Sequence, residues 1–167
     1  NEYFLWFDMH LAESITLSGQ LAIKWTAKET NAFLNERLGT NDVDYVVAID
    51  TDSMYITLDA LVEKEFPGRT TSETVDFVDD LCKRVLTPEI RRATDALGAY
   101  LNAKDASKFS MKRETIADVG IWTAKKKYAL RALDIEGVRL ANPEIKSTGL
   151  EVVKSSTPAV CRDKLES

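Results

Sequence analysis

Apolar residues recur at helical spacing from Leu11 to Leu38, a stretch that contains no proline. Gly39 follows at the place where a C-terminal glycine commonly ends a helix. The pattern therefore predicts one long helix over residues 11–38. Its apolar positions are Leu11, Ile15, Ala22, Trp25 and Leu34.

Two runs rich in β-branched and aromatic residues, "DYVVAI" and "MYITL", flank the turn-forming sequence "DTDS". They predict a buried hairpin. Beyond the "PG" of Pro67 and Gly68, Thr71 or Ser72 caps a second helix, and "TPE" at Thr87 restarts or kinks it before a helical stretch that reaches about Asn102. The apolar face of that second helix is Val75, Val78, Cys82 and Val85 or Leu86.

The remainder, from Lys108 to Val153, is strand-like, with a tight turn at Gly137 in "DIEGVR". The order of elements indicates an α+β fold in which helices pack on an antiparallel sheet that carries the DTD hairpin. The abrupt ends indicate a segment of a longer protein. In particular, Thr157 and Pro158 begin a helix close to the last residue.

Composition narrows the classes of protein. With 44% hydrophobic and 29% charged residues, the 167-residue chain matches one globular domain with a core. The net charge of −5 gives no general attraction to nucleic acid. No apolar run reaches the roughly 18 residues of a membrane span, so we expect a cytoplasmic protein without a membrane partner. Cys82 and Cys161 are far apart and predict reduced thiols.

Two carboxylates, Asp50 and Asp52, stand at the end of the first strand of the predicted hairpin. Alternate side chains of an extended segment point the same way, so both could converge on one divalent cation such as Mg²⁺ or Mn²⁺. The alternative is an ordinary solvated turn. Two uncompensated charges beside apolar strands favour the cation, because an unpaired buried carboxylate is costly.

A basic patch, "KKKY", covers Lys125 to Tyr128 in a strand-like run. Strand alternation places Lys126 and Tyr128 on one face, where a cation beside an aromatic ring suits a nucleic-acid backbone. A solvated strand face is the alternative. Glu114 is a third acidic candidate, although Lys112 and Arg113 beside it suit an ordinary ion pair equally well. The single histidine, His10, has no partner at metal or triad spacing.

The string "AIDTDSMYI" resembles the YGDTDS motif of family B DNA polymerases, and "GIWTAKKKYALRALDIEG" resembles the KKRY-type motif of their T-even-like phage branch. The opening "NEYFLWFDMHLAESITLSGQLAIKW" is similar to the segment that follows their nucleotide-binding helix, and "IKSTGLEVVKSSTP" to the exit from the palm. This resemblance implies that residues 1–154 are the back half of a palm domain and that residues 155–167 begin the connection to the thumb.

The resemblance also implies site residues. Asp52 would be a direct ligand of two catalytic Mg²⁺ ions, with Asp50 a weaker catalytic carboxylate and Glu114 near the metals. A second aspartate would come from the missing half of the palm. Thr51 and Ser53 would shape the turn at the primer end. Contacts to DNA would come from Lys125, Lys126, Lys127 and Tyr128, with Lys126 in the minor groove and Tyr128 at the primer terminus.

Three departures from the family pattern stand out. Ala48 and Ile49 replace the usual Tyr-Gly, which would put a β-branched residue in the turn. Lys112 stands where an acidic residue is usual, and Lys127 replaces an arginine, which keeps the charge but loses the bidentate fork.

The sequence thus predicts a fragment of a DNA-directed DNA polymerase that is inactive by itself. Its partners would be primer-template DNA, deoxynucleoside triphosphates and the remaining polymerase domains or a complementing chain, in the host cytoplasm if a phage encodes it. A DxD-type glycosyltransferase fragment and a non-catalytic nucleic-acid-binding module are the alternatives.

Overall fold

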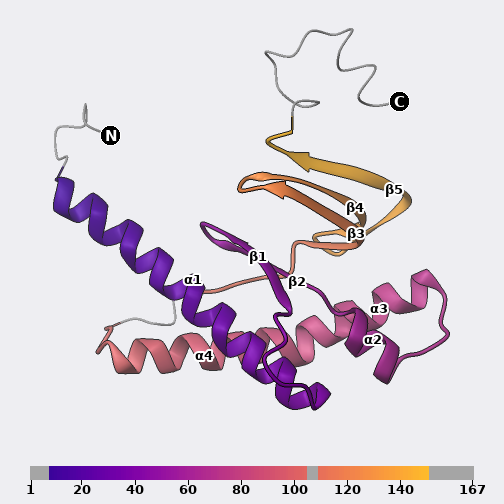
Figure 1. Ribbon diagram of the computed structural model, residues 1–167, viewed down its shortest axis with the longest axis horizontal. Coiled ribbons are helices and arrows are strands. Elements are labelled where there is room, and N and C mark those ends of the chain that lie inside the picture. The colour runs from indigo at the N-terminus through magenta and orange to yellow at the C-terminus, as the bar shows by residue number, and fades with distance from the viewer. Residues whose placement is uncertain (1–7, 105–108, 151–167) are drawn as a thin grey trace, which may run out of the picture. The chain divides into compact units, whose positions relative to one another are not determined.

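A computed structural model describes residues 8–104 and 109–150 (Figure 1). Within these ranges the chain divides into two compact units. The first comprises the described residues up to Thr70 and from Asp80 to Lys112, and the second comprises Thr71–Asp79 and the described residues from Arg113 onward. The predicted helix start at Thr157 and the proposed connection at 155–167 lie outside the described residues.

The first unit is built around α1 (Met9–Leu38), the long helix that the apolar spacing predicts. Asp8 caps its N-terminus by accepting a hydrogen bond from the Leu11 amide at 3.0 Å. Gly39 ends it with a left-handed φ of 72°, as expected for a C-terminal glycine. The buried residues of this helix all lie from its middle toward its C-terminus: Ile23, Thr26, Thr30 and Leu34.

Helix α4 (Thr87–Tyr100) packs against α1. The Trp25 indole N–H donates to the carbonyl oxygen of Ala93 at 2.9 Å, and its ring stacks on Tyr100 at a centroid distance of 6.5 Å. Ala93 and Leu97 are buried on the inner face of α4. This contact, between segments far apart in sequence, forms a helical layer of the first unit.

The strands β1 (Val46–Asp50) and β2 (Ser53–Ile56) form the predicted antiparallel hairpin. Within the described residues it is a separate two-stranded sheet rather than part of a larger one. It is half-buried rather than buried, since Val47 is 47% exposed and Ile49 38%. A short helix that the sequence reading missed, α2 (Asp59–Glu65), follows it.

A new helix, α4, begins at Thr87, where the sequence predicts that the second helix restarts or kinks. A π-helical turn, η1 (Cys82–Leu86), joins α3 (Thr71–Leu81) to it. Pro88 lies at the start of α4, directly after this π-helical turn. In the part of the chain that the structure describes, no helix is long and apolar enough to span a bilayer.

The second unit contains an antiparallel sheet in the order β3 (Thr115–Ala124), β4 (Lys127–Ile135), β5 (Val138–Thr148). Its β4–β5 turn has left-handed backbone at Glu136 (φ 53°) and Gly137 (φ 89°), so the tight turn predicted there is confirmed. Val75 and Val78 of α3 pack with Ile116 and Leu133 of the sheet. The fold is α+β with antiparallel sheets, as predicted.

Candidate functional site

The hairpin that carries Asp50 and Asp52 is attached to α1 by two asparagine side chains. Asn31 Oδ1 accepts hydrogen bonds from the amides of Tyr45 and Val46, both at 2.9 Å. One turn later, Asn35 Oδ1 accepts from the Val43 amide at 3.0 Å, and its Nδ2 donates to the Val43 carbonyl at 2.8 Å. These bonds satisfy the backbone where β1 begins and thereby fix the direction of the strand.

The same attachment is reinforced by side-chain contacts. Asn31 Nδ2 donates to Asp44 at 2.6 Å, and the Thr40 hydroxyl donates to Asn35 Oδ1 at 2.8 Å and contacts the Tyr45 hydroxyl at 2.9 Å. Sequence reasoning missed this cluster. Its available signal was the pair of asparagines four residues apart, which are poor helix formers that commonly serve as hydrogen-bonding groups.

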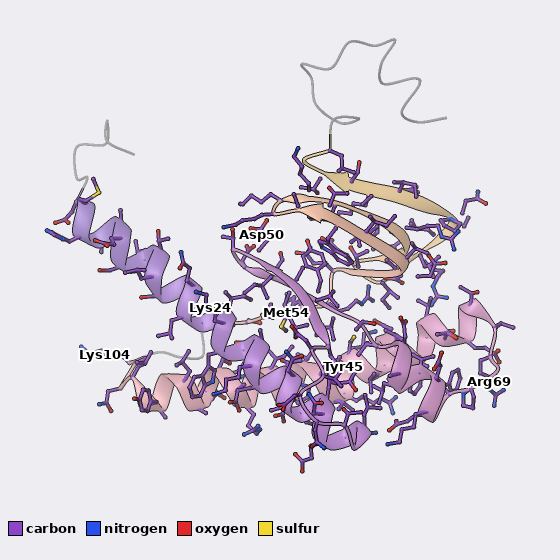
Figure 2. All side chains as sticks on the ribbon, viewed as in Figure 1. Lys24, Tyr45, Asp50, Met54, Arg69 and Lys104 are labelled. Atoms are coloured by element: carbon purple, nitrogen blue, oxygen red, sulfur yellow. The ribbon has the colours of Figure 1, made fainter. Side chains whose placement is uncertain are left out.

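Asp50 lies at the tip of the hairpin (Figure 2), and Asp52 follows it in the turn. Asp50 is the last residue of β1 and pairs with Ser53, whereas Thr51 and Asp52 form the turn. Asp52 is exposed and Asp50 half-buried. The Thr51 hydroxyl donates to Asp50 at 3.1 Å, and the Ser53 hydroxyl donates to Asp52 at 3.4 Å. Asp52 lies outside the strand, so the alternation of strand side chains does not apply to it. The prediction that this alternation makes the two carboxylates converge is therefore wrong.

The strained residue of this turn is Thr51, whose φ is 51°. Left-handed backbone costs an L-residue about 1–2 kcal/mol, and β-branched residues rarely adopt it. Ile49, by contrast, lies within β1 opposite Met54. The expectation that Ile49 would burden the turn is therefore wrong, since the β-branched residue in the turn is Thr51.

The other candidates lie in the second unit. The "KKKY" run does not lie wholly in a strand: Lys125 and Lys126 form the β3–β4 turn, with Lys126 at φ 61°, and only Lys127 and Tyr128 belong to β4. The strand alternation used to pair Lys126 with Tyr128 is therefore wrong. Lys125 and Lys126 are exposed, whereas Lys127 and Tyr128 are half-buried.

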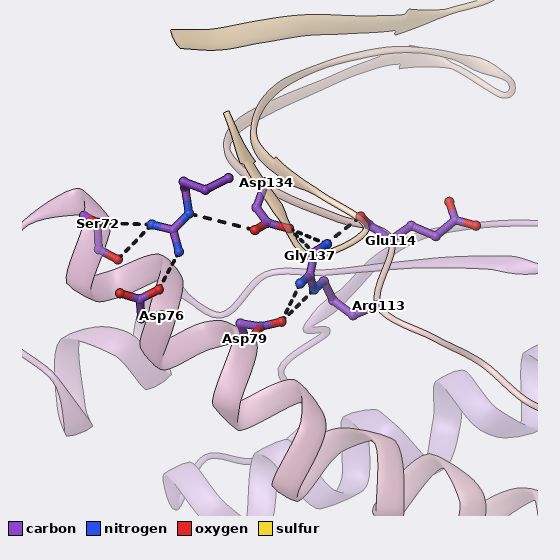
Figure 3. A network of polar contacts seen from close by, with 8 residues as sticks. Ser72, Asp76, Asp79, Arg113, Glu114, Asp134 and Gly137 are labelled. Atoms are coloured by element: carbon purple, nitrogen blue, oxygen red, sulfur yellow. Dashed lines mark hydrogen bonds and ion pairs between the residues drawn. The ribbon is translucent and has the colours of Figure 1, made fainter. Parts of the chain in front are cut away.

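Glu114 lies just before β3 and is exposed. The ion pair expected with its neighbour is not formed by Arg113, which instead binds Asp79 of α3 and Asp134 of β4 (Figure 3). The Glu114 backbone carbonyl accepts from the Glu136 amide at 2.6 Å, and Figure 3 shows its carboxylate directed away from the network.

The network around Arg113 attaches α3 to the sheet. Arg139 extends it: its Nη2 donates to Asp76 at 2.6 Å, its Nη1 donates to the Ser72 hydroxyl at 3.2 Å, and its Nε lies 3.8 Å from Asp134. Burial alone would lower the pKa of Arg113, but its hydrogen bonds to Asp79 and Asp134 raise that pKa above its ordinary value. Arg113 is thus a permanently charged structural residue.

No three acidic, histidine or cysteine side chains gather into a metal-binding cluster within residues 8–104 and 109–150. Asp50 and Asp52 lie on one hairpin of the first unit. Glu114 and residues Lys125–Tyr128, here called the lysine turn, belong to the second unit. The hairpin by itself therefore brings two carboxylates, which is an incomplete ligand set for a pair of divalent ions.

Comparison with known proteins places these features in context. The chain is 38% identical to the DNA-directed DNA polymerase of Escherichia phage RB69 and 36% identical to that of Enterobacteria phage T4, in each case over 99% of its own length. It covers 19% and 20% of those proteins, respectively. No family model matches the chain. The predicted resemblance to T-even-like phage polymerases is confirmed, and it extends over nearly every residue.

Proposed function

We propose that this chain is a segment of a phage-type DNA-directed DNA polymerase and that it contributes the DTD hairpin to the site of nucleotidyl transfer. The similarity to two phage polymerases over 99% of the chain carries this proposal. Residues 1–154 would form the back half of the palm, and residues 155–167 would begin the connection to the thumb. The assembled enzyme would extend primers on template DNA from deoxynucleoside triphosphates in the host cytoplasm.

The hairpin fits the metal chemistry of such an enzyme in part. Bound Mg²⁺ ions would lower the pKa of the primer 3′-hydroxyl and neutralise charge on the triphosphate. Asp52 is suited to hold them, because it is exposed at the tip of the hairpin and its hydrogen bond with the Ser53 hydroxyl is long, at 3.4 Å. Asp50 would support it, Glu114 would stand near the metals, and the remaining aspartate would come from polymerase sequence outside this chain.

The lysine turn would contact the primer-template. Exposed ammonium groups at Lys125 and Lys126, followed by Lys127 and the ring and hydroxyl of Tyr128, can bind phosphate, sugar and groove atoms. Thr51 and Ser53 would shape the hairpin tip at the primer end. The alternatives, a glycosyltransferase fragment or a binding module without catalysis, leave either the lysine turn or the aspartates without a role.

The first test concerns the chain by itself. We expect no primer extension from the purified chain with primer-template, the four deoxynucleotides and Mg²⁺, because two carboxylates on one hairpin do not complete the ligand set. A preparation of Asp52→Asn made in parallel controls for contaminating polymerase. Extension by the wild-type chain above that control would contradict the proposal of an incomplete site.

The second test places the chain in a polymerase. In a chimaera, the chain replaces the matching segment of the phage RB69 relative. Asp52→Asn should lower the rate of incorporation by several decades while primer-template affinity stays near wild type, because the lost charge acts on the transition state. Asp50→Asn is the matched control on the same hairpin and should be milder. Equal or greater damage at Asp50 would overturn the ranking of the two aspartates.

The third test separates a groove contact from a phosphate contact. Lys126→Ala in the chimaera should weaken primer-template binding and increase sensitivity to mismatches at the primer end, with the salt dependence nearly unchanged, if Lys126 reads the minor groove. A phosphate contact would instead reduce the log–log salt slope by about one unit. Tyr128→Phe should cost about 0.5–1.5 kcal/mol if its hydroxyl bonds the primer. Wild-type behaviour from both variants would remove the lysine turn from the site.

A further inference from the structure

The lysine turn is contacted by the glycine that directly follows β5. Gly149 has a φ of 63°, and a Cβ at this position would overlap the carbonyl oxygen of Lys126 and stand 3.1 Å from its carbonyl carbon. The same added Cβ would also lie 3.5 Å from Lys127 Cγ. The backbone at Gly149 therefore lies directly against the turn at Lys126, at a distance that no other amino acid permits.

The neighbouring aromatic residue of the turn is held by a tryptophan. Trp122 of β3 is the cross-strand partner of Tyr128, and their rings stack at a centroid distance of 6.4 Å with an interplanar angle of 27°. The Trp122 ring lies over Gly120, where a Cβ would come within 2.6 Å of two ring carbons. Gly120 thus provides the space that the ring occupies, and the ring fixes one side of Tyr128.

These contacts are formed within the chain itself, and the contact at Gly149 is closer than a left-handed glycine turn requires. The β4–β5 turn of the same sheet provides the comparison, because Gly137 is also left-handed (φ 89°) but a Cβ there would find its nearest neighbour, Arg113 Nη2, only at 3.9 Å. A left-handed glycine is required at both places, whereas close backbone approach is found at Gly149 alone of the two.

We propose that Trp122 and Gly149 are positioning residues for primer-template binding: Gly149 fixes the backbone of Lys126, and Trp122 fixes the ring of Tyr128. The inference rests on the proposed function of the lysine turn. It adds two residues that no motif in the sequence identified, and both act through another residue rather than by touching DNA.

The readout is the ratio of extension from matched and mismatched primers by the chimaeric polymerase. This ratio does not depend on the fraction of enzyme that is folded, so a merely structural defect would leave it unchanged. Gly149→Ala should change the ratio about as much as Lys126→Ala, on the order of fivefold to twentyfold, where each tenfold change is about 1.4 kcal/mol. Gly137→Ala, which incurs similar backbone strain without the overlap, should change it by less than about twofold.

Trp122 is tested by removing and restoring the aromatic ring. Trp122→Leu should change the mismatch ratio, and Trp122→Phe should restore most of it. Gly120→Ala, which displaces the indole without removing it, should behave like Trp122→Leu. In a Tyr128→Leu background, Trp122→Leu should add little, because residues that act through one contact are not additive.

The outcomes separate this inference from the proposed function. If Lys126→Ala and Tyr128→Phe both behave as wild type, the lysine turn has no role at the primer and the proposed function of that turn fails. A second result separates the two proposals. If Lys126→Ala and Tyr128→Phe impair extension, but the mismatch ratio of Gly149→Ala equals that of Gly137→Ala and the ratio of Trp122→Leu equals that of Trp122→Phe, the positioning role is refuted. The proposed function of the lysine turn then stands. Should Gly149→Ala fail to fold, the tryptophan series decides between the same two results.

Discussion

Replacing Arg113 by methionine should destabilise the chain strongly. Methionine keeps an unbranched apolar stem of similar reach and removes only the guanidinium. The side chain of Arg113 is 13% exposed, and that of its partner Asp134 is 5% exposed. Removing one member of a buried ion pair leaves an uncompensated charge, which typically costs about 3–5 kcal/mol.

The structure places the expected cost at the lower end of that range, about 3 kcal/mol, because Asp134 keeps some compensation. Arg139 Nε remains 3.8 Å away, and the Gly137 amide still donates to Asp134 at 3.0 Å. Arg131→Met is the matched control, since it breaks an ion pair with Asp118 in which the arginine side chain is 49% exposed. That surface pair should contribute far less to stability than the Arg113 network, because water screens an exposed ion pair.

Urea denaturation of the purified chain, followed by far-UV circular dichroism, measures both losses in the free energy of unfolding. The double variant Arg113→Met with Asp134→Asn should lose less than the sum of the single changes, because removing both charges leaves none unpaired. If Arg113→Met lowers the free energy of unfolding by less than about 1 kcal/mol, or if Arg131→Met lowers it equally, the buried ion pairs of Arg113 do not stabilise the attachment of α3 to the sheet.

Three further predictions concern α1 and the sheet. Within the described residues the buried Thr30 hydroxyl has no hydrogen-bond partner, whereas the Thr26 hydroxyl donates to the Ala22 carbonyl. Thr30→Val should therefore stabilise the chain by about 1 kcal/mol relative to Thr26→Val, and equal urea midpoints for the two variants would contradict this prediction. Asn31→Leu, which deprives two backbone amides of their acceptor, should cost about 2–3 kcal/mol, and a loss under about 0.5 kcal/mol would mean that the attachment of β1 is redundant. The hydrogen bond from Arg131 lowers the pKa of Asp118. The stability that this ionised carboxylate contributes is therefore present above its unfolded pKa of about 3.9 and is lost as pH falls through the lowered pKa of the folded state. Asp118→Asn should flatten the acid dependence of the free energy of unfolding in that pH range, and an unchanged profile would contradict this prediction.

The sequence by itself determined the local elements. Apolar spacing and Gly39 define α1 within two residues of the observed bounds, and the β-branched runs around "DTDS" define the hairpin, because helix termination and turn chemistry depend on residues close in sequence. The two motifs around "DTDS" and "KKKY" were also enough to indicate the resemblance to phage polymerases, because residue types and their order along the chain can be compared without a structure.

Tertiary structure decided what those elements do together. Asn31 and Asn35 are weak helix formers by sequence, but in the structure their side chains accept hydrogen bonds from the backbone just before β1. Arg113 suited a surface pair with Glu114, but folding brings Asp79 and Asp134 to it from elements that are distant along the chain. Such pairings depend on which segments meet in space, and no local pattern specifies that.

The lysine turn shows the same division most clearly. "KKKY" has the composition of a strand with a basic face, but the sharp reversal at Lys126 requires left-handed backbone that a lysine adopts only under constraint. That constraint comes from Gly149 at the far end of β5 and from the ladder that pairs Trp122 with Tyr128. Sequence determined which groups are available for binding, and the packing of one sheet decided where they are held, because backbone strain is maintained only when surrounding contacts outweigh it.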